Sequence, residues 1–455
     1  MPLISINPST GKMIEEFSEL TEEGIASHIK KAEKSFSKWR STDLKHRSRL
    51  LNNVAEDLRS NCKKYAGLMT QEMGKPIKEA RSEIEKSAWV CNYYSENATK
   101  FLKPSIVETD ASQSYVTFLP LGIILGIMPW NFPFWQVFRF AAPTLMAGNV
   151  CLLKHASNVT RCSLAIESIF RAAGFPDGCF ISMLIENNHV GKIIENPLIK
   201  AISLTGSTSA GKVVASKAGA VLKKTVLELG GSDPYIVLKD ANLNEAVSAC
   251  VTGRLINTGQ SCIAAKRYII EESISEVFQE KLILAMKKKL VGNPLDELND
   301  LGPIARSDLR KTLHHQVIKS IDAGAKCLLG GKIPSGSGFY YPITILTDVE
   351  KGMPAYEEEL FGPVACIIPV KNKTQAIKVA NDTSFGLGAA IFTSDIDKGE
   401  RIAREFIEAG TIFVNDFVRS DPRLPFGGIK ESGYGRELSK FGMKEFVNIK
   451  TIYIK

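Results

Sequence analysis

Apolar residues recur at helical spacing through residues 44–102, among many charged side chains. Leu50, Leu51, Val54 and Leu58 fall on one face of such a helix, which leaves the charged residues on the other face. This pattern is typical of amphipathic helices that cover a core with one side. We therefore predict that the N-terminal part of the chain is mainly helical.

From about Tyr115 the pattern changes to short apolar runs that alternate with helical periods. The runs predict strands, and the periods between them predict helices that cross from one strand to the next. This alternation is typical of parallel sheets, and a dinucleotide-binding sheet is the first fold to expect. The predicted strands are 150–154, 179–185 and 201–205, and the predicted helices are 159–173 and 209–218.

The alternation begins again after Gly230 and Gly231, which places a domain boundary near Gly230. Residues 447–455 at the end alternate apolar and polar side chains, like a strand with one solvated face. A terminal strand needs a sheet to join, and the sheet of another subunit is one candidate. The alternating segments after Gly231 predict strands at 235–238 and 267–270 and helices at 242–256 and 274–289.

The composition indicates a folded globular protein. The chain has 455 residues, of which 44% are hydrophobic and 23% charged, and at roughly 150 residues per domain this length allows about three units. The net charge of +8 is spread along the chain without a long basic run. We therefore expect no nucleic-acid partner, although a mildly basic surface suits an anionic ligand.

The cysteines and the apolar segments bear on the location of the protein. Nine cysteines form no CxxC pair, so we expect reduced thiols in a cytoplasmic protein and no metal site. The opening residues Met1–Pro8 turn too early for a signal peptide. Arg139 is the only charge in 111–153, but four prolines interrupt this stretch. We expect it to form buried core, not a membrane helix.

Two residues have the chemistry of a covalent catalyst. Cys262 follows a turn that contains Gly259, where backbone amides can favour the thiolate. A buried, inert thiol is the alternative. Glu228 lies between two leucines at the end of a predicted strand, where desolvation would raise its pKa and make it a general base. An exposed carboxylate at a turn is the alternative for Glu228.

Two further features suggest anionic ligands. Residues 206–212 follow a predicted strand and open a helix, as a phosphate-binding loop does. The P-loop pattern nearly matches, but Val213 replaces the magnesium-binding hydroxyl, which argues against a nucleotide hydrolase. Arg139 has no carboxylate in its own segment. Either a carboxylate from elsewhere in the fold pairs with it, or the substrate brings one.

These segments together resemble the aldehyde dehydrogenase superfamily, and the resemblance runs nearly end to end. Each motif alone is weak, but their order and spacing are specific. The matching segments are Asn7–Gly11, Pro129–Pro133, Lys154, Leu204–Ser207, Glu228–Gly231, Gly259–Cys262, Glu359–Pro363 and Pro425–Gly428.

The resemblance implies roles for three catalytic residues. Cys262 would be the nucleophile, forming a thiohemiacetal and then a thioester, and Asn131 would donate to the oxyanion. Glu228 would activate the water that hydrolyses the thioester. Because that carboxylate is present, we expect a free acid as product and not a coenzyme A thioester.

The resemblance also implies a nicotinamide cofactor. It assigns Lys154 to the adenosine ribose, Ser207 to the pyrophosphate and Glu359 to the nicotinamide ribose. Many NAD-preferring members have a glutamate where this chain has Ser157. Since a hydroxyl can donate to a 2′-phosphate and a carboxylate would repel it, we predict NADP, with NAD as the alternative. The remaining expected cofactor contacts are Trp130, Gly206 and Phe361.

Within the superfamily the chain looks most like the bacterial succinate-semialdehyde dehydrogenases. Arg139 falls where that group places a substrate-carboxylate arginine, and Trp135 and Ser420 are the other expected substrate contacts. Some members carry a second arginine where this chain has Ile256. Ser420, or one of its neighbours Arg419 and Arg423, could take over that second contact. Ala264 replaces a second cysteine near the nucleophile, so no local disulfide switch is expected.

The resemblance predicts an α/β fold with three parts. These are a Rossmann-like cofactor domain at 1–110 and 130–229, a catalytic domain at 230–425, and a small β-element at 111–129 and 436–455 that bridges subunits of a homodimer or homotetramer. The predicted function is NADP-linked oxidation of succinic semialdehyde. One alternative is an aldehyde dehydrogenase for uncharged aldehydes, and a more distant one is a non-catalytic nucleotide-binding protein.

Overall fold

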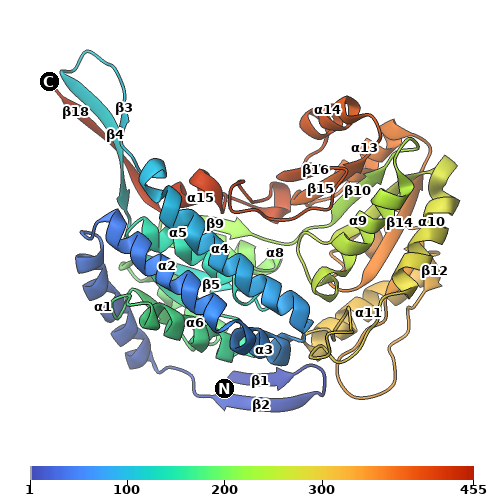
Figure 1. Ribbon diagram of the computed structural model, residues 1–455, viewed down its shortest axis with the longest axis horizontal. Helices are drawn as coiled ribbons and strands as arrows, with labels where there is room; N and C mark the ends of the chain where they lie inside the picture. Colours follow the sequence, from blue (N-terminus) through green and yellow to red (C-terminus); the bar gives the residue numbers. More distant parts are fainter. Residues whose placement is uncertain (1–2) are drawn as a thin grey trace.

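Figure 1 gives the computed structural model, which describes residues 3–455. A hairpin of β1 (Leu3–Asn7) and β2 (Lys12–Phe17) precedes a layer of long helices. Leu51, Val54 and Leu58 are completely buried, so the predicted apolar face does cover a core, and the helical prediction for this part is confirmed. The helices are α1 (Glu22–Trp39), α2 (Leu44–Ser60), α3 (Cys62–Met73) and α4 (Ile77–Phe101).

The first large sheet has six strands in the order β17, β9, β8, β5, β6, β7. Its neighbours are parallel except β17, which runs antiparallel to β9. The strands are buried almost throughout, which explains their continuous apolar runs. They are β5 (Ile123–Met128), β6 (Val150–His155), β7 (Phe180–Ser182), β8 (Ile199–Thr205), β9 (Lys224–Glu228) and β17 (Gly433–Tyr434). The helices associated with this sheet are α5 (Trp135–Met146), α6 (Thr160–Ala172), α7 (Val190–Glu195) and α8 (Thr208–Ala220).

The second large sheet has seven strands in the order β12, β13, β14, β11, β10, β15, β16, and only the β12–β13 pair is antiparallel. The chain enters it just after the expected boundary at Gly230. Its strands are β10 (Asp233–Val237), β11 (Ala265–Glu271), β12 (Lys326–Leu329), β13 (Thr344–Thr347), β14 (Val364–Val370), β15 (Gly388–Phe392) and β16 (Thr411–Val414). Its helices are α9 (Leu243–Leu255), α10 (Glu272–Lys287), α11 (Ser307–Asp322), α12 (Pro354–Glu357), α13 (Lys373–Asn381) and α14 (Ile396–Phe406).

A small third sheet projects from the body as an arm that carries the C-terminus (Figure 1). It contains β3 (Ser105–Ile106), β4 (Gln113–Pro120) and β18 (Val447–Ile454), which follows α15 (Ser439–Glu445). The terminal strand β18 therefore joins β4 of its own chain. The expected range 111–129 for this element was too long, because β5 is buried between β6 and β8 in the six-stranded sheet.

The six-stranded sheet brings three predicted cofactor contacts to one edge. Strands β6, β5 and β8 are parallel neighbours. Lys154 lies near the end of β6, Trp130 follows β5, and Gly206 follows β8. The carboxyl ends of parallel strands are where open α/β sheets bind their ligands. No helix of residues 3–455 is long and apolar enough to cross a membrane.

Candidate active site

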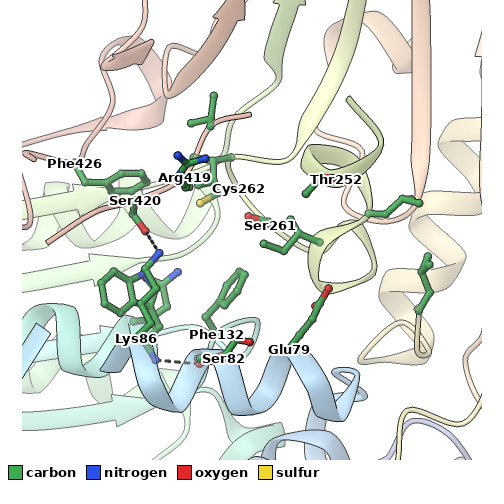
Figure 2. Close-up of a pocket in the computed structure, with 18 of the residues that line it drawn as sticks. Glu79, Ser82, Lys86, Phe132, Thr252, Ser261, Cys262, Arg419, Ser420 and Phe426 are labelled. Atoms are coloured by element: carbon green, nitrogen blue, oxygen red, sulfur yellow. Dashed lines mark hydrogen bonds between the residues drawn. The ribbon is translucent and has the colours of Figure 1, made fainter. Parts of the chain in front are cut away.

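Cys262 lies where two cavities meet. The first has a volume of about 380 Å³, the second a volume of about 280 Å³, and Cys262 contributes to the wall of both. The predicted substrate contacts Trp135, Arg139 and Ser420 line the first cavity, part of which is drawn in Figure 2. The second contains Trp130, Asn131, Gly206, Ser207, Glu359 and Phe361. The fold thus separates the expected substrate residues from most of the expected cofactor residues, with the sulfur between them.

A strained turn positions the nucleophile. Asn257 and Thr258 have positive φ angles of 54° and 58°. Such angles cost about 1 to 3 kcal/mol for residues other than glycine and persist only where the surroundings fix them. The Asn257 side-chain amide donates to the carbonyls of Asn131 at 2.7 Å and Gln260 at 2.9 Å. The turn is therefore tied to the segment that carries the predicted oxyanion donor.

Gly259 allows this turn to pack closely. Its φ is 75°, and a Cβ atom there would lie 2.3 Å from the carbonyl oxygen of Gly362. A larger residue would push the Cys262 loop away from the loop that carries Phe361. The glycine is required by the close contact as well as by the turn.

The state of the Cys262 thiol differs from our expectation. We expected turn amides to favour the thiolate, but no hydrogen bond to its sulfur exists within residues 3–455. Burial raises the pKa of Cys262 to about 12, although the charges of Arg139 and Lys266 act against this rise. This rise favours the protonated thiol at neutral pH. The Lys266 ammonium instead donates to the Cys262 carbonyl oxygen at 2.7 Å.

Asn131 is held beside the nucleophile loop. Its side-chain N–H donates to the Gln260 carbonyl at 3.1 Å. The amide therefore shares a cavity wall with Cys262 and keeps one further hydrogen for a ligand. Its role as oxyanion donor stays a prediction.

Glu228 is buried, not exposed at a turn. Burial raises its pKa well above the ordinary value, the charge of Glu437 adds to this, and Arg139 opposes it. Neither carboxyl oxygen has a hydrogen-bond partner within residues 3–455. A Cβ at Gly427 would lie 2.8 Å from one of these oxygens, so this glycine makes room for the carboxyl. Glu228 lines neither cavity in this conformation.

Arg139 has a carboxylate partner within the chain. Its guanidinium forms an ion pair with Glu437, and both side chains are almost completely buried. Arg139 also lies over the ring of Phe426 at 4.8 Å from its centre. Of the two alternatives for Arg139, the structure therefore supports a carboxylate from elsewhere in the fold. The expected contact between Arg139 and the substrate stays a prediction, since Arg139 also lines the first cavity.

The second cavity has the features of a dinucleotide site. Ser207 caps α8 by accepting from the Ala210 amide, and no atom lies within 4 Å of a Cβ built at Gly206, so the start of this helix is open to a phosphate. The Phe361 and Trp130 rings meet edge to face at 5.7 Å between centres. Glu359 accepts from the Gly231 amide at 3.2 Å, and burial raises its pKa.

Lys154 and Ser157 both lie at the carboxyl end of β6. Lys154 is buried, and its ammonium has no ion pair or hydrogen bond within residues 3–455. Burial lowers its pKa to about 8. Ser157 is exposed at the start of the short helix η1 (Ser157–Val159). A buried cation without a hydrogen bond or ion pair in the described part of the chain, three residues before an exposed serine, fits an anionic ligand such as a nucleotide phosphate.

A profile of the aldehyde dehydrogenase family matches residues 2–452 of the chain. The chain belongs to the aldehyde dehydrogenase family. The predicted α/β aldehyde dehydrogenase fold and the predicted enzyme class, an NAD(P)-dependent aldehyde dehydrogenase, are both confirmed.

Curated relatives match the chain over its whole length. The NAD(P)+ succinate semialdehyde dehydrogenase Sad of Escherichia coli is 47% identical over 99% of this chain and 97% of its own. The NADP(+) succinate-semialdehyde dehydrogenase 1 of Mycobacterium tuberculosis is 45% identical over 100% of both chains. Among solved structures, succinic semialdehyde dehydrogenase from Streptococcus pyogenes in complex with NADP+ has a TM-score of 0.97 and 37% identity, covering 99% of both chains.

Sequence reasoning missed three charged residues of this aldehyde dehydrogenase site. Glu437 pairs with Arg139, Lys266 holds the Cys262 carbonyl, and Lys86 of α4 lines the substrate cavity. Nothing near Glu437 in the sequence points to Arg139. Lys86 lies in a helical segment rich in charged residues, so its sequence context predicts an exposed lysine on the solvated face of that helix.

Proposed function

We propose that the chain oxidises succinic semialdehyde to succinate and prefers NADP. The observation that carries this proposal is the position of Cys262 between a cavity with cationic groups and a cavity at the carboxyl edge of a dinucleotide-type sheet. The names of the relatives described above support both the substrate and the cofactor. The presence of Cys262 and Glu228 argues against a non-catalytic nucleotide-binding protein.

Cys262 provides the nucleophile. Its sulfur attacks the aldehyde carbon and forms a thiohemiacetal, whose oxyanion accepts hydrogen bonds from the Asn131 amide and the Cys262 backbone N–H. Because the raised pKa favours the protonated thiol, its proton has to pass to solvent water in the cavity as the carbon–sulfur bond forms. Oxidation of the thiohemiacetal leaves a thioester on the same sulfur.

Glu228 provides the base for hydrolysis of that thioester. A carboxyl group with a raised pKa is a stronger base, once ionised, than an ordinary glutamate. Since Glu228 lines neither cavity, its side chain has to turn toward Cys262 for this step. Its lack of hydrogen-bond partners makes such a rotation inexpensive.

The residues of the second cavity fit a bound NADP. When bound, NADP supplies a two-electron acceptor for the substrate carbon. Ser207 and the open amides of α8 would hold the pyrophosphate, and Glu359 the nicotinamide ribose. Lys154 and Ser157 would hold the adenosine ribose and its 2′-phosphate, and the unpartnered Lys154 ammonium fits that charge.

Steady-state kinetics of the wild type with two aldehydes and two cofactors tests the proposal. We expect the highest kcat/KM for succinic semialdehyde with NADP, and lower values for butanal or for NAD. A higher kcat/KM for butanal would favour the alternative function, oxidation of uncharged aldehydes, which the apolar cavity wall of Val251, Leu255 and Ile263 would also accommodate.

We also propose that the protein is a cytoplasmic homodimer or homotetramer, with the projecting arm as its contact. The exposed apolar residues Ile449, Tyr453 and Ile454 of β18 support this proposal. Light scattering coupled to size exclusion should give two or four chains per particle, and removal of residues 447–455 should lower that number. A wild-type monomer would contradict this proposal.

A further inference from the structure

We propose that Lys86, with Ser420, is the principal binding site for the carboxylate of the substrate. This inference rests on the proposed oxidation of a semialdehyde. It starts from a comparison of the charged groups on the wall of the substrate cavity. Arg139 pairs with Glu437, Arg419 pairs with Asp416 at 2.7 Å, and Lys289 pairs with Asp300 at 3.2 Å. Lys86 is the cation of this cavity that has no carboxylate within 4 Å among residues 3–455.

The surroundings hold the Lys86 ammonium in a fixed place. It donates to the Ser420 hydroxyl oxygen at 2.8 Å and lies 4.4 Å from the centre of the Trp135 ring. Figure 2 shows the side chain rising from α4 to Ser420. A lysine that loses little freedom on binding is a better ligand for an anion than a mobile surface lysine.

The pair retains the donors that a carboxylate needs. An ammonium has three hydrogens, of which Ser420 accepts one. The Ser420 hydroxyl accepts from Lys86, and its own hydrogen has no acceptor within residues 3–455. One carboxylate oxygen can therefore accept from Lys86 and the other from Ser420. Ile256 lines the same cavity and offers no charge.

The electrostatics of the cavity agree with this geometry. The pKa of Lys86 is lowered to about 8. Burial is the main cause, and the charges of Arg139 and Arg419 act in the same direction, while those of Asp421 and Glu83 oppose it. A buried ammonium without an ion-pair partner is stabilised when an anion binds to it. The incoming carboxylate would then be in direct contact with Lys86.

The test compares Lys86→Met with the wild type on succinic semialdehyde and butanal. We expect kcat/KM for succinic semialdehyde to fall about 10- to 100-fold, mainly through KM, as loss of a hydrogen bond to a charged group predicts. For butanal, which has no carboxylate, kcat/KM should change less than about threefold. The inhibition constant of succinate should rise by the same factor as KM. Lys86→Arg should restore most of the loss.

Lys78→Met is the matched control, because Lys78 is half-exposed on the same helix and does not line the cavity. Lys78→Met should leave kcat/KM for both aldehydes and the inhibition constant of succinate unchanged. If Lys86→Met and Lys86→Gln lower kcat/KM equally for both aldehydes, Lys86 is structural. If they lower kcat/KM for neither aldehyde, Lys86 does not bind the substrate. Either result overturns the inference while the proposed function stands. If the wild type itself does not prefer succinic semialdehyde, the proposed function fails as well.

Discussion

Removal of the Arg139 charge should destabilise the protein more than it alters substrate choice. Arg139 and Glu437 form an ion pair in which both side chains are almost completely buried. Loss of one partner leaves the other carboxylate in a low-dielectric environment, which costs about 3 to 5 kcal/mol. For a cooperative unit of roughly 200 residues this lowers the thermal midpoint by about 6 °C or more.

The assay is thermal unfolding of Arg139→Met, Glu437→Gln and the double variant, combined with kinetics on succinic semialdehyde and butanal. The double variant removes both charges, so it should recover most of the lost stability. In the single Arg139 variant, kcat/KM should fall for both aldehydes together. Arg139 opposes the rise in the pKa of Glu228, so its loss leaves less of the ionised base for either substrate. A stable Arg139→Met that loses only succinic semialdehyde activity would refute this reasoning and assign Arg139 to the substrate carboxylate.

Three further predictions concern catalysis and cofactor. Cys262→Ala should abolish turnover yet bind NADP with an affinity within about twofold of the wild type, measured by calorimetry; appreciable oxidation would exclude a covalent route. Ser157→Glu should reverse the preference for NADP, with a loss of about ten- to a hundredfold in kcat/KM for NADP; no reversal would mean that Ser157 does not decide the preference. Because the pKa values of Cys262 and Glu228 are both raised, kcat/KM should increase as pH rises through and above neutrality, and a profile that falls over that range would contradict the assigned protonation states.

The sequence predicted the parts of the fold that depend on local patterns. The strands β6 and β8 are buried on both sides and therefore read as continuous apolar runs, and Gly206 could be placed after β8 for the same reason. Cys262 and Glu228 became candidates because a turn or a strand end lies beside each of them, but only the resemblance to the family assigned their roles.

The charge partners could not be predicted in the same way. Glu437 reaches Arg139 only because the segment after β17 passes next to α5, which no local pattern encodes. The same holds for the Cys262 thiol, whose raised pKa results from burial by distant segments, while the turn alone suggested a thiolate. Lys86 became a candidate only when the fold placed Ser420 at 2.8 Å from it.

Mass spectrometry of a stalled enzyme tests the central claim most directly. Glu228→Gln, mixed with succinic semialdehyde and NADP, should release about one equivalent of reduced cofactor per active site and then stop. Digestion at low pH should then reveal a peptide that contains Cys262 and has gained the mass of one succinyl group. The doubly substituted Cys262→Ala and Glu228→Gln chain should give neither the burst nor the adduct. Continued turnover without an adduct, or a succinyl group on a residue other than Cys262, would contradict the account.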